Sequence, residues 1–330
     1  MWRRLFSHLV LLLVSSGTAL SAPTLLNASY DVTREFYKEF NDSFAADWKT
    51  KTGETPKIDQ SHGGSSKQAR SVLDGLEADV VTMNQSTDID ILAQNGLVAK
   101  DWADRFPDHA SPYTSTIVFL VRKGNPKQIK GWDDLVKSGV EVIIPHPKTS
   151  GNGRYSYLAA WSHAKHLPGG SDATAKDFVT RLFKNVPVLD AGGRGATTTY
   201  AQRQIGDVLL TFENEAHLAL REFGADQNEI VYPASSVLAE APIAVVEKYT
   251  AKHGTQALAK AYLDALYTPA AQELAAKHKL RPRSAEVLAK HSSDFPALKL
   301  YRIEDEFGGW PEAQKTHFAD GGLFDQIYSP

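Results

Sequence analysis

Short segments with a strand pattern alternate with helical segments along most of the chain, and this alternation constrains the fold more than any other feature. Residues 78–82 and 140–144 are short runs rich in β-branched residues, as in buried strands, whereas Phe36, Phe40 and Phe44 recur at helical spacing. Strands separated by helices pair mainly in parallel, because each helix carries the chain back across the sheet. The sequence therefore predicts an α/β fold with mainly parallel sheets flanked by helices.

Residues 1–22 are predicted to be a cleavable signal peptide. Arg3 and Arg4 precede an apolar run at 9–14, and small residues follow up to Ser21 and Ala22, after either of which cleavage could occur. The apolar run is shorter than the ~20 residues that span a bilayer, so we favour a signal peptide over a membrane anchor. The predicted location is the bacterial periplasm, with an untethered extracellular protein as the alternative.

Removing the signal peptide leaves 308 residues (330 − 22), more than one hydrophobic core usually organises, so we expect two lobes. The segments 116–122 and 242–247 are candidate crossover strands between them. The predicted first lobe is discontinuous, 23–115 plus 243–330, and the predicted second lobe is 116–242. A cleft between such lobes would lie at the carboxyl ends of the strands, where α/β sheets bind ligands.

Composition and motifs exclude several classes of function. The chain has no cysteine, which rules out disulfides, thiolate nucleophiles, cysteine-ligated zinc and iron–sulfur clusters. Its net charge of −3 gives no basic surplus for nucleic acid. The histidines show no metal-ligand spacing, and phosphate-binding, nucleophile-elbow and zinc-protease motifs are absent. We expect no metal, no cofactor and no catalysis.

Four predicted strand-to-helix junctions consist of small or hydroxyl-bearing residues. They are 29–33, 61–66, 149–153 and 192–197, entering helices predicted to begin at Thr33, Lys67, Tyr155 and Thr198. A helix start offers unpaired N–H groups and a partial positive charge, glycine allows close approach, and serine or threonine adds a hydroxyl donor. If the four junctions converge, they predict a site for a small oxyanion. The alternative for each junction is an ordinary N-cap or turn.

These junctions also carry a resemblance to a known family. The segments concerned are 25–31, 60–69, 78–82, 112–116, 121–127, 147–152, 192–199 and 304–310. Together they resemble the periplasmic sulfate/thiosulfate-binding proteins that feed ABC importers, from Leu25 to Tyr328. The resemblance implies a type II periplasmic-binding-protein fold, two lobes that close on one sulfate or thiosulfate dianion, and a membrane permease as partner. We expect a monomer, because a carrier that closes a cleft needs no oligomer interface.

The resemblance also implies which residues bind the anion. The family holds its dianion mainly with backbone N–H groups and hydroxyls, without a cationic side chain in contact. Carried over by position, the donors are Asp31, Ser65, Ser150, Gly151, Asn152 and Gly193. Asp31 would contribute its backbone N–H, with its carboxylate pointing away from the anion. Residues expected to support the binding loops are Tyr30, His62, Gly64 and Arg194.

Phe212 departs from the sulfate branch of the family, which has a tryptophan before the Glu-Asn-Glu sequence. Phenylalanine cannot donate the indole hydrogen bond. In this respect the chain resembles the thiosulfate branch, as it does in residues 83–85, Tyr155 and the 192–199 loop. We hypothesise that Phe212 gives the terminal sulfur of thiosulfate an apolar wall. The alternative is that Phe212 is simply a core residue.

Three other functions stay open at this point. One is a carrier of molybdate or another tetrahedral oxyanion. Another is a secreted hydrolase of sulfate or phosphate esters, although no nucleophile motif supports it. The third is a carbohydrate-binding protein that stacks sugars on Tyr30, Tyr113 or Tyr232. For the leading hypothesis we also expect rejection of phosphate, because a site made only of donors leaves the proton of hydrogen phosphate unpaired.

Overall fold

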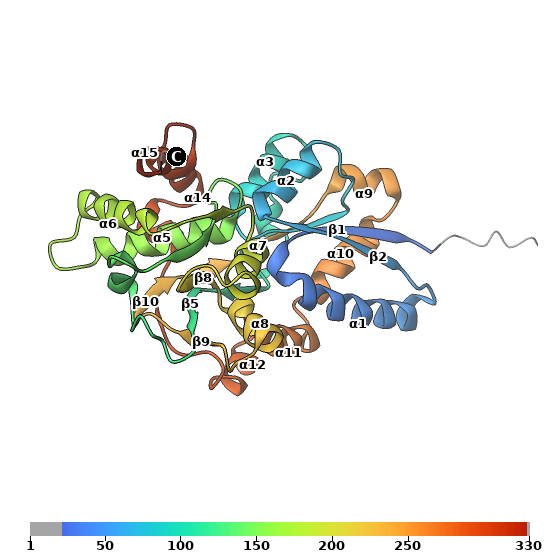
Figure 1. Ribbon diagram of the computed structural model, residues 1–330. Helices are drawn as coiled ribbons and strands as arrows, with labels where there is room; N and C mark the ends of the chain where they lie inside the picture. Colours follow the sequence, from blue (N-terminus) through green and yellow to red (C-terminus); the bar gives the residue numbers. More distant parts are fainter. Residues whose placement is uncertain (1–21, 329–330) are drawn as a thin grey trace, which may run out of the picture.

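The computed structural model describes residues 22–328 and consists of two α/β halves side by side (Figure 1). Residues 1–21 of the predicted signal peptide lie outside the described residues. The first half is built on a four-stranded sheet of order β12-β3-β1-β2. Its strands are β1 (Thr24–Tyr30), β2 (Lys57–Gly63), β3 (Val80–Thr82) and β12 (Ile243–Val245). β1 is parallel to β2 and β3, while β12 pairs antiparallel with β3.

The second half is built on a five-stranded sheet of order β7-β6-β8-β5-β9. Its strands are β5 (Ile117–Arg122), β6 (Val142–Pro145), β7 (Leu189–Asp190), β8 (Val208–Phe212) and β9 (Asn228–Val231). β6 is parallel to β7 and β8, whereas β5 runs antiparallel to β8 and β9. The mainly parallel, helix-flanked α/β architecture predicted from the sequence is confirmed.

Helices cover both sheets. Those of the first half are α1 (Arg34–Thr52), α2 (Ser65–Leu73), α3 (Ser86–Gln94), α9 (Glu247–His253), α10 (Gln256–Ala265) and α11 (Pro269–Lys277). Those of the second half are α5 (Gly151–Lys165), α6 (Asp172–Lys184), α7 (Gly193–Thr197) and α8 (Glu213–Phe223). Shorter helices are α4 (Pro107–Ala110), α12 (Ala285–Lys290), α13 (Ile303–Phe307), α14 (Trp310–Ala313) and α15 (Leu323–Ile327). Among residues 22–328, no helix has the length and apolar character needed to cross a bilayer.

The aromatic stripe of α1 shows how the sequence pattern becomes core. Phe36, Phe40 and Phe44 are all buried, and Phe40 and Phe44 each meet the ring of Tyr262 in α10, at 5.1 and 5.2 Å between centroids. Edge-on aromatic pairs of this kind add to the free energy gained from burying apolar area. α1 ends where Gly53 takes a left-handed conformation (φ 80°), which favours glycine. The stripe thus anchors α1 against α10.

The two halves are joined by a small antiparallel sheet of order β11-β4-β13. Its strands are β4 (Tyr113–Ser115), β11 (Ala239–Glu240) and β13 (Arg281–Pro282). β4 leads directly into β5 of the second half, and β11 leads into β12 of the first. The chain crosses a third time after β13, on the way to the C-terminal segment. Because the strands at these crossings pair with one another, a small rotation of this sheet would move one half relative to the other.

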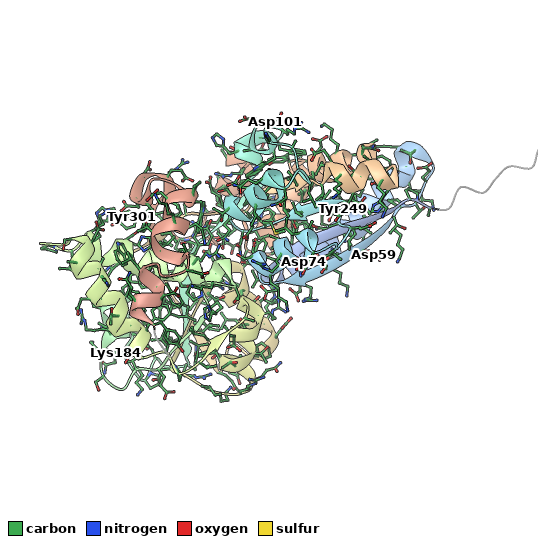
Figure 2. The ribbon with its side chains drawn as sticks, turned by 90° about the horizontal axis from the view of Figure 1, so that it is seen from above. Asp59, Asp74, Asp101, Lys184, Tyr249 and Tyr301 are labelled. Atoms are coloured by element: carbon green, nitrogen blue, oxygen red, sulfur yellow. The ribbon has the colours of Figure 1, made fainter. Side chains whose placement is uncertain are left out.

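The C-terminal segment packs on the second half. β14 (Lys299–Tyr301) pairs with β10 (Ser235–Val237), and Phe324 of α15 meets Phe183 of α6 at 5.4 Å. Figure 2 shows Tyr301 in the same half as Lys184, apart from Asp59 and Tyr249. The predicted lobe bounds stay a prediction, and these contacts support moving residues 299–328 into the second lobe.

Candidate functional site: a cleft of helix N-termini

Six strand ends, three from each half, face one another across the cleft. Because β1, β2 and β3 are parallel, their carboxyl ends share one edge of the first sheet. The ends of β6, β7 and β8 share one edge of the second sheet in the same way. A helix begins within a few residues of each strand end. This arrangement brings several helix N-termini to one place.

The helices at the glycine- and serine-rich junctions begin earlier than the sequence predicts. α2 begins at Ser65 rather than Lys67, α5 at Gly151 rather than Tyr155, and α7 at Gly193 rather than Thr198. The candidate donors at these positions therefore lie in first helical turns, where backbone N–H groups have no partner within the helix. This strengthens the case for an oxyanion site.

The N-cap residues of these helices do not themselves cap the first-turn N–H groups. The caps of α2, α5 and α7 are Gly64, Ser150 and Gly192, and none of them makes a side-chain cap hydrogen bond. Ser150 carries the hydroxyl that normally caps a helix, and it is buried. Its hydroxyl and the first-turn N–H groups of α5 are therefore available to a ligand.

Close approaches of glycines to neighbouring junctions, two of them across the halves, show that the four junctions converge. A Cβ built on Gly64 would lie 2.5 Å from the carbonyl oxygen of Thr149 and 2.9 Å from that of Ala191. A Cβ on Gly192 would lie 2.5 Å from Oδ2 of Asp31. A Cβ on Gly193 would lie 3.0 Å from Nδ2 of Asn152. These contacts bring the 61–66, 149–153, 192–197 and 29–33 junctions together.

Asp31 connects the first half to the N-terminus of α7. Its Oδ2 accepts the backbone N–H of Arg194 at 3.2 Å. Burial raises the pKa of this carboxyl, and the hydrogen bond from Arg194 opposes the rise. One first-turn N–H of α7 is thus used by protein, and the carboxylate is directed to that helix. The backbone N–H of Asp31 also hydrogen-bonds its own carboxyl group and opposes the rise of its pKa.

Ser65 differs from the simple picture of a hydroxyl donor. Its Oγ donates to Oδ2 of Asp88 at 2.5 Å and accepts the backbone N–H of Asn84 at 3.2 Å. The hydroxyl proton is therefore directed to Asp88. In this arrangement Ser65 has its backbone N–H to offer, and the serine hydroxyl available to a ligand is that of Ser150.

Arg194 joins the two halves through carboxylates. Its guanidinium donates to Glu35 of α1 at 3.0 and 2.8 Å, and it also pairs with Glu215 of α8, with Nε 2.9 Å from Oε1. Burial lowers the pKa of Arg194, but the hydrogen bonds to Glu35 and the charge of Glu215 outweigh burial and raise it overall. Its charge is therefore already balanced by protein.

Two more arginines are paired across the halves. Arg281 donates to Glu213 at 2.7 and 2.9 Å, and the buried Arg154 lies 4.0 Å from Asp88. With these cations balanced by carboxylates, charge stabilisation of a bound anion would depend on backbone dipoles and hydroxyls.

A groove of about 530 Å³ lies beside the converging junctions. It is lined on one side by α2 and α3 and on the other by residues 148–154 and 314–320, and it includes Thr149 and Ala191. Lys67, Arg70 and Lys148 line it. Lys148 is paired with Asp320, which also lines the groove, so any attraction of small anions to it would depend on Lys67 and Arg70.

The supporting residues lie around the cleft. His62 is in β2, and burial, with the nearby charge of Arg34, lowers its pKa to about 4, so the ring is neutral at pH 7. Its Nε2 contacts Oε1 of Gln60. Tyr30 meets Phe212 at 6.2 Å and Phe212 meets Tyr155 at 5.7 Å, both edge-on. Phe212 is therefore buried, as a core residue would be, and is also the N-cap of α8 at a strand end of the cleft.

The tyrosines considered for sugar stacking are not arranged as platforms. Tyr30 and Tyr113 are buried, and the Tyr113 hydroxyl hydrogen-bonds to that of Tyr37 at 2.9 Å. The Tyr232 hydroxyl lies 3.0 Å from Nε2 of His217. Residues 22–328 also hold no group of three or more histidine, aspartate or glutamate side chains placed to bind a metal ion.

Comparison with known proteins gives the family. Residues 26–281 match the family model of bacterial extracellular solute-binding proteins. The chain is 57% identical to a thiosulfate-binding protein of Pseudomonas aeruginosa over 99% of both chains. It is 55% identical to a sulfate-binding protein of Escherichia coli over 97% of both. The chain belongs to the sulfate/thiosulfate-binding family of these solute-binding proteins.

A solved member of this family has the same fold. The sulfate-binding protein SubI from Mycobacterium tuberculosis superposes with a TM-score of 0.81 and 33% identity, over 89% of this chain and 98% of that one. A periplasmic thiamin-binding protein shares the fold with a TM-score of 0.61 at 18% identity. The fold is the type II periplasmic-binding-protein fold, as the resemblance implied.

Asn84 was not among the site residues predicted from the sequence. The motif 83–85 was noted only as a feature of the thiosulfate branch. In the structure Asn84 follows β3, and its side-chain amide packs against Gly151 of the other half. The end of β3 was the available signal, because the two strands parallel to it in the first sheet, β1 and β2, both lead into predicted binding loops.

Proposed function

We propose that the protein captures thiosulfate, and also sulfate, in the periplasm and delivers it to the membrane permease of an ABC importer without catalysing a reaction. The observation that carries the proposal is the convergence of uncapped helix N-termini from both halves, at Ser65, Ser150, Gly151 and Gly193, with the nearby arginines already paired. Such a cleft binds a compact dianion and offers nothing to a nucleophilic reaction. The relatives' names point the same way.

The strength of binding that such a site needs is attainable. A dissociation constant of 1 μM corresponds to about −8.2 kcal/mol. Hydrogen bonds to a charged group contribute ~1.5–3 kcal/mol each. Five of them, from Asp31, Ser150, Gly151, Asn152 and Gly193, give about 7.5–15 kcal/mol together, a range whose upper part also covers the costs of desolvation and closure of the halves. The net negative charge of the chain is therefore no obstacle.

Preference for thiosulfate over sulfate rests on Phe212, not on overall similarity. Identities of 57% to a thiosulfate-binding relative and 55% to a sulfate-binding one do not separate the two ligands. Phe212 stands at the end of β8 with no polar hydrogen to offer. We propose that it accommodates the terminal sulfur, which is larger than oxygen and a poorer acceptor.

Calorimetric titration of ligand-stripped mature protein with thiosulfate, sulfate and phosphate tests the proposal. We expect micromolar or tighter binding of thiosulfate, equal or weaker binding of sulfate, and no heat from phosphate. Much tighter binding of sulfate than of thiosulfate would leave the proposed role as an anion carrier intact and overturn the proposed preference for thiosulfate. Heat from neither sulfur anion would overturn the function, and molybdate would then be the next ligand to titrate.

A further inference from the structure

Asn84 occupies a defined position at the cleft. It is the second residue after β3, only 4% of its surface is exposed, and its backbone N–H donates to Oγ of Ser65. Because Ser65 is in turn held by Asp88, this hydrogen bond ties the main chain at Asn84 to the start of α2. The side chain therefore projects from a rigid base in the first half.

The amide of Asn84 reaches the start of α5 in the other half. A Cβ built on Gly151 would lie 1.8 Å from Oδ1 and 2.8 Å from Nδ2 of Asn84. The amide thus fills the space that any larger residue at 151 would need. α5 is a helix of 15 residues, and Gly151 is its first. Asn84 is the side chain of the first half that lies against this helix N-terminus.

Within the part of the chain that the structure describes, Oδ1 of Asn84 is buried and has no hydrogen-bond partner. A buried acceptor without a donor is unfavourable. Asn152, close by, is the contrast: its Nδ2 donates to Thr211 at 3.0 Å and its Oδ1 accepts from Ser156 at 3.3 Å. The side-chain amide of Asn152 is thus hydrogen-bonded by protein, whereas Oδ1 of Asn84 has no partner.

We propose that the side-chain amide of Asn84 is a further ligand-binding group, which donates a hydrogen bond to the sulfur oxyanion held at the N-terminus of α5. This inference rests on the proposed function and deepens it. A half-turn of the amide exchanges its oxygen and nitrogen within the same volume. This rotation directs the N–H₂ group of Asn84 toward the ligand and moves the unpaired oxygen Oδ1 away from the ligand.

The orientation of the amide also bears on selectivity. With the nitrogen toward the ligand, Asn84 offers donors and no acceptor, so the proton of an oxyanion such as hydrogen phosphate finds no partner there. With the oxygen toward the ligand, Asn84 would accept the proton of hydrogen phosphate. Discrimination against phosphate therefore reports which way the amide of Asn84 faces.

Calorimetry on three variants tests the assignment. Asn84→Ala is expected to bind thiosulfate at least tenfold more weakly than the wild type. Asn84→Asp, which has the same shape and a negative charge, is expected to bind more than a hundredfold more weakly. Asn228→Ala is the matched control, because both amide atoms of Asn228 are also buried and unpartnered, but in β9, away from the cleft. It should bind as the wild type does.

Thermal unfolding of each variant separates loss of binding from loss of fold, and Asn84→Asp remains informative should the alanine variant unfold. If either Asn84 variant binds thiosulfate within twofold of the wild-type affinity, the inference is overturned. The proposed function would still stand in that case, because the wild type binds the anion. Displacement of thiosulfate by millimolar phosphate would overturn the donor orientation. Failure of the wild type itself to bind thiosulfate and sulfate would overturn the proposed function.

Discussion

Gly64 of the first half packs so closely on Thr149 of the second that a Cβ on the glycine would lie 2.5 Å from the threonine carbonyl oxygen. The same Cβ would lie 2.9 Å from the carbonyl oxygen of Ala191. Both neighbours are backbone atoms, which cannot turn aside as a flexible side chain can. The closed arrangement of the cleft therefore depends on the absence of a side chain at position 64.

Gly64→Ala should hinder closure without unfolding either half. Gly64 has φ −56° and ψ 137°, which alanine adopts freely, so the variant suffers only where the halves meet. Overpacking costs ~1–3 kcal/mol, and we expect about 10-fold to 100-fold weaker thiosulfate binding by calorimetry. Gly131→Ala is the control, because a Cβ there would meet nothing within 4 Å. Equal affinity of the two variants would contradict this account.

Glu35→Gln should weaken binding only slightly. The Arg194–Glu35 pair is partly exposed, and Arg194 keeps Glu215 as a partner when Glu35 is neutral. Pairs of this kind contribute ~0–1 kcal/mol, so the affinity for thiosulfate should fall by less than about fivefold. A loss as large as that expected for Gly64→Ala would show that the pair, rather than backbone contact, holds the cleft closed.

Arg194→Met should instead lower stability. Burial raises the pKa of Glu215 to about 7, and the charge of Arg194 is the main opposing influence. Without that arginine, the buried carboxylate loses its counter-charge, a change that costs about 3–5 kcal/mol in other proteins. The Tm of the variant should lie further below that of the wild type at pH 8, where the carboxyl of Glu215 would need to ionise, than at pH 5.5. A pH-independent difference would argue against this cause.

His253 should stabilise the protein at acidic pH. Its Nδ1 lies 2.9 Å from Asp79 and its Nε2 lies 3.0 Å from Glu77, and the hydrogen bonds to Asp79 and Glu77 raise its pKa. A raised histidine pKa contributes stability that is complete below the ordinary value of about 6.5 and is lost as pH rises through the folded-state pKa. His253→Gln should therefore cost stability at pH 5.5, by up to ~1 kcal/mol given its exposure, and little at pH 9. Urea unfolding at both values measures this, and a difference that grows with pH would refute it.

The sequence predicted the strand–helix alternation and the four junctions because both depend on local pattern. The helix starts came out two to five residues late, since glycines such as Gly193 are poor helix formers on their own. In the structure, the carboxylate of Asp31 accepts the N–H of Arg194 from the other half and supports the first turn of α7. A contact between residues 163 positions apart cannot be read from local pattern.

The role of Asn84 and the position of the C-terminal segment were hidden for the same reason. The open amide of Asn84 becomes visible only when Gly151 of the other half is placed beside it. Residues 299–328 were predicted to belong to the first lobe, whereas the pairing of β14 with β10 and the packing of Phe324 on Phe183 support placing them with the second half. Tertiary contacts supply this information.

Phe212→Trp should shift the preference of the site from thiosulfate toward sulfate. The indole would add an N–H donor at the end of β8, which an oxygen of sulfate accepts better than a terminal sulfur does. Phe212 is also packed edge-on against Tyr30 and Tyr155, so the larger ring will strain the core whatever the ligand. Only the ratio of the two affinities separates these effects. Phe119→Trp enlarges a buried ring of β5 that packs against Trp132, and it should leave the ratio unchanged. We expect at least a fivefold change in the ratio for Phe212→Trp by calorimetry, and an unchanged ratio would mean that Phe212 is a core residue without a part in selectivity.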